Sequence, residues 1–517
     1  MSESFPLKHG TGGHNLTSNG TSTSTSGSLL VYGTDDNNGI AAATNPSSSP
    51  RAAVPSHHHT IGMVGSISIA VNILTGPAML DLPATFQRSG WIPTIATLIF
   101  VCILSSLCSL HMADTISKYP GNLKFEQEVE FSETFRFFWG HKWFVVTEII
   151  FFICITCLNI SSIVDTAQVV DTFLGQFVGS SSALHMSGAF QEMQLVHWYP
   201  SNCSAEQLKA GECVAFAEHS DGMILTLGYV ISTLIFLPMG LMDLKENASF
   251  QAVAFVVLIV TVAQFAIEFG ARGFDFDNMS LWGTSWDALL GVVLFNFALA
   301  IAIPSWLFER HPSVNVPLVI HGSSILATIL YIIVGATGAL AIPHVSDNML
   351  ESMMSGAFGL SMQLGSSLFA FMIVGLGIPL FSVLARMNLT GSGLTTYHVA
   401  NLFAVYLPFS VSWMLYQGDL VTQLLSWGGV LFISAVAFIL PLILTLHTVM
   451  EFDVEGSIEV YAGFLPQSMV ASKRSKITAL VVILTLTSLA VGSAIAGQFA
   501  IVREMPVDDI FPLPTEK

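Results

Sequence analysis

Charged side chains are scarce in this sequence. Only 10% of its 517 residues are Asp, Glu, Lys or Arg, and 52% are hydrophobic, whereas a soluble domain carries about 25% charged residues. This shortage argues against a water-soluble protein, because so much apolar surface needs lipid as its solvent. The formal charge of −18 reflects acids that cluster in polar loops, such as Glu126, Glu128, Glu130 and Glu133, which we expect to be solvated.

Other features are also missing. No basic patch interleaved with aromatic residues is present, so we expect no nucleic-acid partner. No nucleophile beside a base, metal-ligand cluster or phosphate loop stands out, so we expect neither an enzyme nor a bound metal or cofactor. The six cysteines are too few for a disulfide framework. Cys203 and Cys213 share a polar segment and can form a disulfide if that segment lies outside the cytosol.

Long apolar stretches are what the sequence does contain. From Ile61 onward, stretches of about 20 residues recur, each long enough to cross a hydrocarbon core of about 30 Å. Because unpaired backbone amides are not tolerated in lipid, these stretches predict an all-α membrane protein with about eleven transmembrane helices. The third can continue as a helix to Phe177. The predicted spans lie near 61–86, 91–113, 143–166, 222–242, 250–270, 286–308, 316–341, 362–385, 397–416, 420–446 and 476–502.

The chain divides into three predicted parts. Residues 1–60 are rich in Ser, Thr, Gly and Asn, which predicts a disordered tail. Residues 61–502 form the transmembrane domain, and residues 503–517 form a short carboxyl-terminal tail. With the amino terminus in the cytosol, twelve of the 17 Lys and Arg residues fall inside and five outside, as the positive-inside rule requires. The carboxyl terminus is then outside or lumenal, in a plasma membrane or a vacuolar or endolysosomal membrane.

The first predicted span contains a helix-breaking sequence, Thr75-Gly76-Pro77-Ala78. The nitrogen of Pro77 cannot donate to the carbonyl of Ile73, and Gly76 lowers the cost of a non-helical turn. Amides freed at such a break can receive a carboxylate, and freed carbonyls can receive an ammonium group or a cation. A simple proline kink is the alternative interpretation.

Several motifs together resemble a known family. They are Asn72, Gly76, Leu80, Leu82-Pro83-Ala84, Phe86 and Gly90-Trp91, then Ile303-Pro304-Ser305-Trp306 and His311-Pro312, then Tyr331, Gly335 and Gly338, and finally Ile378-Pro379-Leu380-Phe381-Ser382 with Arg386-Met387-Asn388-Leu389. This set resembles the amino acid/auxin permease family, whose members are proton- or sodium-coupled amino acid transporters. The resemblance implies a 5+5 inverted-repeat fold of the APC/LeuT type plus one extra helix.

The resemblance also implies where the substrate binds, namely between the broken first and sixth helices. The residues that it places there are Thr75, Gly76, Pro77, Ala78, Asn296, Phe297 and Ala298. Many relatives carry a second glycine at the position of Ala78, whose methyl group restricts backbone approach or favours a smaller substrate. The sixth span has neither glycine nor proline between Val292 and Ile303, so its residues do not reveal a break.

Candidates for binding the coupling ion fall into two sets. For sodium, Ser366 and Ser367 offer hydroxyl oxygens, together with the first span around Asn72, although serine pairs in membrane helices more often bond their own backbone. For a proton, a titratable group is needed. Asp81 lies just beyond the first break and can be a gate residue or a proton acceptor, and Asp165 belongs to a polar stripe on the third span.

The sequence therefore predicts an alternating-access carrier, in which an amino acid and one cation, H⁺ or Na⁺, bind at the helix breaks. The alternative is a membrane amino acid sensor that binds substrate and signals through its tail without net transport. A channel would need a continuous polar lining or rings of charge, and only single polar residues are present. The expected partners are a small-molecule amino acid and the lipid bilayer, and the oligomeric state is not predicted.

Overall fold

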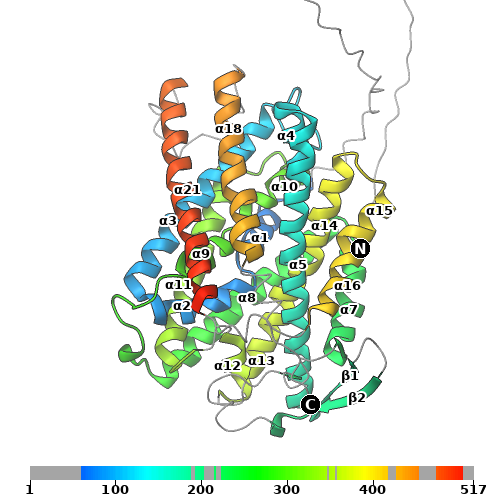
Figure 1. Ribbon diagram of the computed structural model, residues 1–517, viewed down its shortest axis with the longest axis vertical. Coiled ribbons are helices and arrows are strands. Elements are labelled where there is room, and N and C mark those ends of the chain that lie inside the picture. The colour runs from blue at the N-terminus through cyan, green and yellow to red at the C-terminus, as the bar shows by residue number, and fades with distance from the viewer. Residues whose placement is uncertain are drawn as a thin grey trace, which may run out of the picture. The chain divides into compact units, whose positions relative to one another are not determined.

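A computed structural model describes most of the membrane domain (Figure 1). The described residues are 60–187, 192–202, 215–216, 223–345, 349–354, 358–416, 427–452 and 473–504. The predicted amino-terminal tail and most of the carboxyl-terminal tail lie outside these ranges, as do Cys203 and Cys213.

Helices dominate the described residues, and each of the eleven predicted spans contains at least one. Eight helical stretches have the length and composition to cross a membrane, and a ninth follows if a bent pair at the start counts as one span. The unbroken long helices are α3 (Trp91–Ser117), α5 (His141–Val178), α8 (Leu244–Arg272), α11 (Val316–Ala341) and α21 (Lys473–Glu504). The end of α5 confirms that the third span continues through Phe177.

The remaining spans are short or interrupted. The fourth is α7 (Leu227–Gly240), with only 14 residues. The eighth to tenth spans each contain a π-helical segment. They consist of α13 (Leu360–Phe369), η6 (Ala370–Val374) and α14 (Gly375–Gly391), then α15 (Tyr397–Asn401), η7 (Leu402–Tyr406) and α16 (Leu407–Met414), then η8 (Gly429–Ile439) and α18 (Leu440–Glu451).

Two spans are broken near their middle. The first consists of α1 (Met63–Leu74), η1 (Pro77–Asp81) and α2 (Leu82–Ser89), and its two halves are bent by 52°. The sixth consists of α9 (Leu289–Asn296), η5 (Leu299–Ile301) and α10 (Ile303–Glu309). Broken helices of this kind are characteristic of inverted-repeat transporters.

Several small elements were not predicted. A short helix, α4 (Phe131–Trp139), lies between α3 and α5, and α12 (Met349–Met354) follows α11. Three antiparallel strands form a sheet in the order β2-β1-β3. They are β1 (Ser181–Ser187), β2 (Glu192–Trp198) and β3 (Met223–Thr226). The sheet is therefore a small addition to a membrane domain that is otherwise helical.

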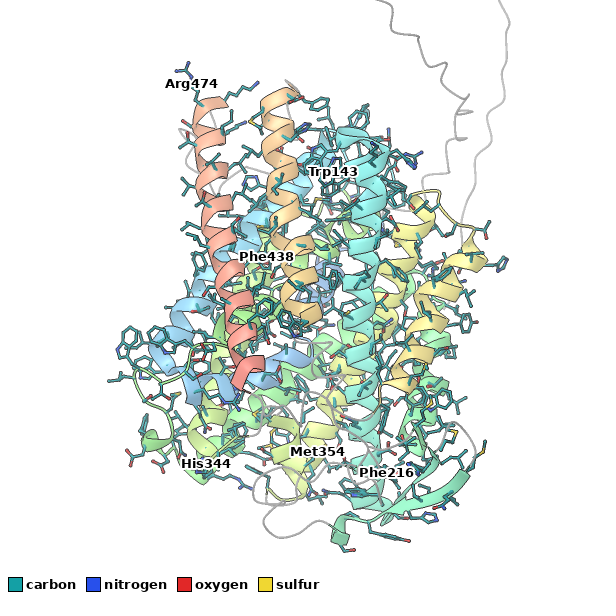
Figure 2. The ribbon with its side chains drawn as sticks, in the orientation of Figure 1. Trp143, Phe216, His344, Met354, Phe438 and Arg474 are labelled. Carbon is teal, nitrogen blue, oxygen red and sulfur yellow. The ribbon has the colours of Figure 1, made fainter. Side chains whose placement is uncertain are left out.

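The two ends of the helices are easily identified in the structure. We call inner the end that the positive-inside pattern assigns to the cytosol, and outer the opposite end. Figure 2 shows Trp143 and Arg474 at the inner end and His344, Met354 and Phe216 at the outer end. Large apolar side chains are exposed along the long helices between these ends, for example at 103, 260 and 267, as expected of surfaces that face lipid.

Candidate functional site

The first break begins where α1 ends at Leu74. Thr75 leaves the helical conformation with φ −94° and ψ 45°, and Gly76 is extended with φ −73° and ψ −164°. Pro77 then starts η1, as expected for a residue that has no N–H to continue the helix. The Thr75 hydroxyl donates to the Val71 carbonyl at 2.8 Å. The break thus brings the carboxyl end of α1 and the amino end of η1 together.

The second break begins where α9 ends at Asn296. Phe297 has φ −109° and ψ 44°, and the chain becomes α-helical again only at Ile303. Side chains from two other helices bind the carbonyls at this position. The Ser105 hydroxyl of α3 donates to the Phe297 carbonyl at 2.9 Å, and the Tyr331 hydroxyl of α11 lies 2.9 Å from the Asn296 carbonyl. These donors explain how the helix ends without glycine or proline.

The two breaks face each other. The Asn296 amide donates to the Ala78 carbonyl across the junction at 3.1 Å. The Tyr331 hydroxyl contacts the carbonyl oxygens of both Leu74 and Asn296, the last residues of α1 and α9. The Phe297 ring meets the Tyr331 ring edge to face, with 5.4 Å between ring centroids. The structure therefore brings the predicted residues of the first and sixth spans together. Sequence reasoning gave Tyr331 no role at the junction.

The helix ends give the junction a particular electrostatic character. The partially negative carboxyl ends of α1 and α9 meet there, and two residues separate the end of α1 from the start of η1. The side-chain oxygen Oδ1 of Asn296 is buried and has no hydrogen-bond partner among the described residues. Carbonyl and amide oxygens of this kind can accept from an ammonium group or coordinate a cation.

The junction is closed in this structure. Thr75, Ala78, Phe297 and Ala298 are all buried. On the inner side of the junction, a mostly apolar cavity between α1, α10 and α11 has a volume of about 10 Å³, which is room for about one water molecule. The structure thus represents an occluded state on this side.

The predicted sodium ligands differ in whether their polar atoms have hydrogen-bond partners. The Asn72 amide donates to Gln251 of α8, at 2.8 Å to its carbonyl and 2.7 Å to its side-chain oxygen, while Asn72 Oδ1 has no partner among the described residues. The Ser367 hydroxyl donates to the carbonyl of Gln363 in its own helix at 2.8 Å. The buried Ser366 hydroxyl has no partner within the described ranges.

The predicted proton acceptors are both half-buried. Asp81 ends η1, and its backbone carbonyl accepts from the Thr85 hydroxyl at 2.9 Å. Asp165 lies on α5 and accepts from the Ser161 hydroxyl at 3.2 Å. The roles of both acids in binding a proton stay predictions.

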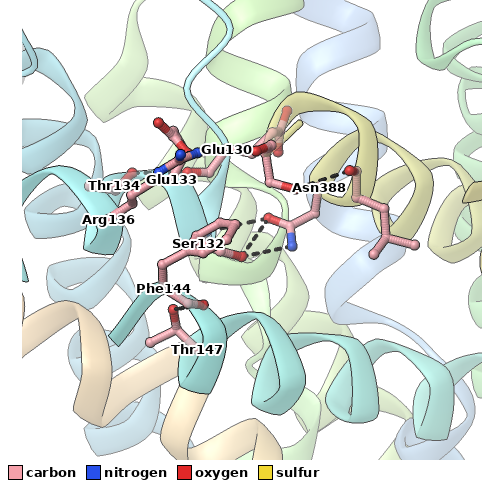
Figure 3. Close-up of polar contacts among 10 residues, drawn as sticks. Glu130, Ser132, Glu133, Thr134, Arg136, Phe144, Thr147 and Asn388 are labelled. Atoms are coloured by element: carbon pink, nitrogen blue, oxygen red, sulfur yellow. Dashed lines mark hydrogen bonds and ion pairs between the residues drawn. The ribbon is translucent and has the colours of Figure 1, made fainter. Parts of the chain in front are cut away.

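One acid that we expected to be solvated is buried. Glu126 is exposed as predicted, but the prediction is wrong for Glu130, which is only 1% exposed. The reason is contact with distant helices, since the Ser305 hydroxyl of α10 donates to Glu130 Oε2 at 2.7 Å. Figure 3 shows Glu130 beside Ser132 and Asn388. A buried acid outside the predicted sites therefore lies at the inner end.

Comparison with known proteins supports a transporter. Residues 59–204 match the model of the tryptophan/tyrosine permease family, whereas no curated protein matches significantly. Among solved structures, the chain is similar to Mhp1, a nucleobase-cation-symport-1 family transporter in a closed conformation with bromovinylhydantoin bound. The TM-score is 0.50 at 10% identity, over 89% of this chain and 95% of that chain. The chain thus has an inverted-repeat transporter fold, and these findings do not confirm the assignment to the amino acid/auxin permeases.

Proposed function

We propose that the protein transports amino acids across a membrane by alternating access, driven by a proton or sodium gradient. The observation that carries the proposal is the junction of the two broken helices, where Asn296 and Tyr331 join the ends of α1 and α9. Transporters of this architecture bind substrate at such discontinuities and alternate access around them.

The junction offers complementary groups to both ends of a zwitterion. An ammonium group can donate to Asn296 Oδ1 and to the carbonyl of Leu74, which then exchanges the Tyr331 hydroxyl for the ligand. A carboxylate can accept from backbone amides that the first break frees at the start of η1. Because a hydroxyl has one proton, Tyr331 donates to only one of its two carbonyl partners at a time, and the other carbonyl stays available.

The walls of the junction favour an apolar substrate side chain. Ala78, Phe297 and Ala298 contribute mainly apolar surface there, and all three are buried. The match of residues 59–204 to the tryptophan/tyrosine permease family adds aromatic amino acids to the candidates. The coupling cation has two candidate sets, Asn72 with Ser366 and Ser367 for sodium, and Asp81 or Asp165 for a proton.

The test is uptake of labelled amino acids into liposomes that contain the purified protein, with a proton or a sodium gradient imposed separately. Tryptophan, tyrosine, alanine and leucine are supplied one at a time. Accumulation against a concentration gradient, abolished by an ionophore for the driving ion, is the expected result and identifies that ion. Saturable binding without accumulation would instead support the sensor, and the absence of both binding and uptake would refute an amino acid ligand.

A further inference from the structure

Three elements meet around Glu130 at the inner end of the molecule. Glu130 is the residue before α4, and its Oε2 accepts from the Ser305 hydroxyl of α10 at 2.7 Å. Gly391, the last residue of α14, leaves room for the side chain, since a Cβ there would lie 2.7 Å from Glu130 Cγ. The hydrogen bond to Ser305 therefore connects the inner half of the broken sixth span to the α4 segment.

The carboxyl group of Glu130 lacks the donors that a buried negative charge needs. Its second oxygen, Oε1, is buried and has no hydrogen-bond partner among the described residues. Burial raises the pKa of Glu130 to about 8, Ser305 opposes this through its hydrogen bond, and the neighbouring acids Glu128, Glu148 and Glu309 raise the pKa further. Among the described residues, the charged groups that act on Glu130 are thus acidic, and they come from its own segment, from α5 and from α10.

The wall behind Glu130 is a second polar network. Asn388 of α14 exchanges hydrogen bonds with the Ser132 hydroxyl at 3.1 and 2.8 Å (Figure 3). The Asn388 amide also donates to the Glu148 carboxyl on α5 at 3.0 Å. This network joins α4, α5 and α14, none of which contains the breaks. It forms a fixed surface against which Glu130 faces Ser305.

We propose that Glu130 is a proton-binding site and that its contact with Ser305 is an inner gate, which takes up one proton from the cytosol on closing and returns it on opening. The inference rests on the proposed function, because the gate supplies a step of the transport cycle. The ligand is a proton, and the moving part is α10. Neither Asp81 nor Asp165 is needed for this step.

The direction of the pH effect follows from burial. In the closed state Glu130 is out of water and prefers to be neutral, whereas separation of α10 from α4 would hydrate it and return its pKa toward the ordinary 4.5. The closed state therefore binds the proton more tightly, and closing is favoured as pH falls through about 8. The ratio of open to closed protein should rise about tenfold per pH unit up to that point.

Hydrogen exchange followed by mass spectrometry tests the gate without requiring transport. Full-length protein in nanodiscs is compared at pH 6 and pH 9, and each peptide's rate is divided by its intrinsic rate at that pH. In the wild type we expect peptides covering α10 and α4 to exchange at least about tenfold faster at pH 9. Glu130→Gln, a neutral isostere, should stay protected at both pH values. Glu126→Gln, which removes an exposed acid from the same segment, should keep the wild-type pH profile.

Two further variants make the outcome decisive. Ser305→Ala removes the hydrogen bond and should lower the protection of α10 at pH 6 toward its pH 9 level. Glu148→Gln should keep the pH dependence but move it to lower pH, because Glu148 is one of the neighbouring acids that raise the pKa of Glu130. The proposal is overturned if wild-type exchange shows no pH dependence, or if that dependence survives in Glu130→Gln or disappears in Glu148→Gln. If the exchange pattern is as expected but no amino acid is taken up, the proposed function is refuted and the proton site at Glu130 is still supported.

Discussion

Two buried carboxyl groups, one at each end of the molecule, have opposite hydrogen-bonding situations. Asp171 at the outer end accepts three hydrogen bonds, from the Ser181 hydroxyl at 2.6 Å, the Gly228 amide at 2.8 Å and the Tyr416 hydroxyl at 2.6 Å. Glu130 at the inner end accepts one side-chain hydrogen bond among the described residues, from Ser305, and one of its oxygens has no partner there. The number of donors, and not burial alone, separates the two acids.

The difference indicates which contact is independent of pH, the one at Asp171, and which depends on pH, the one at Glu130. Three donors satisfy the buried Asp171 carboxyl, so it holds α5, β1 and α7 together with the chain after α16. Gly228 is part of this fit, because a Cβ there would lie 2.6 Å from the Asp171 carboxyl carbon. A carboxyl with one donor is neutral while buried and ionises in water, so its contact depends on pH.

The largest effect is expected at the fixed outer corner. Asp171→Ala would leave three buried donors without an acceptor, each costing about 1–3 kcal/mol. We expect the free energy of unfolding in detergent to fall by at least about 3 kcal/mol. The decrease should be the same at pH 6 and pH 8. Asp165→Ala is the matched control, because it removes a half-buried acid on the same helix that accepts from the Ser161 hydroxyl. If Asp171→Ala loses no more stability than Asp165→Ala, the three hydrogen bonds of Asp171 do not distinguish the two acids.

A smaller effect is expected at the outer closure. Gln87 of α2 donates to the carbonyls of Ala339 and Ile342 at 2.9 and 2.7 Å and accepts from the Val345 amide at 3.1 Å. Gln87→Ala should lower the free energy of local opening in residues 339–345 by about 1–2 kcal/mol. Hydrogen exchange of these residues should be faster by the corresponding factor. Because none of these groups titrates between pH 6 and 9, the increase should be the same at both. A pH-dependent increase would mean that the outer end also switches.

The smallest effect is expected at the wall of the inner gate. Gly391→Ala would place a methyl group 2.7 Å from Glu130 Cγ. Because the Glu130 side chain can shift, we expect the low end of the usual overpacking cost, about 1 kcal/mol. We expect faster exchange of α10 at pH 6, with little change at pH 9, where the gate is already open. Gly322→Ala serves as the control, because a Cβ added there would meet nothing within 4 Å. Equal behaviour of the two variants would show that Glu130 is not confined by α14.

Much of the fold could be predicted from sequence, because membrane spans are a property of local composition. The long apolar stretches predicted segments that all contain helices, and Gly76 with Pro77 predicted the first break where the structure has it. Both signals are local, since a proline lacks an N–H whatever surrounds it.

The rest depended on contacts between distant parts of the chain. The second break is stabilised by Ser105 and Tyr331, which come from α3 and α11, so the local residues around Asn296 gave no breaker signal. Glu130 lies in sequence among acids that are exposed or half-buried, and its contacts with α10 and α14 come from distant parts of the chain. Two of the strands near the outer end, β1 and β2, lie in a polar segment for which no element was predicted, and β3 lies at the start of the predicted fourth span.

The central claim is that the junction of the two breaks is the substrate site, and removing the Tyr331 hydroxyl tests it most directly. Counterflow of the amino acid identified by uptake would be measured in liposomes containing Tyr331→Phe, with Tyr406→Phe, an exposed tyrosine, as the control. The account predicts that Tyr331→Phe changes substrate affinity by about tenfold or more, corresponding to about 1.4 kcal/mol, while Tyr406→Phe behaves as wild type. Unchanged affinity in Tyr331→Phe would contradict the placement of the site.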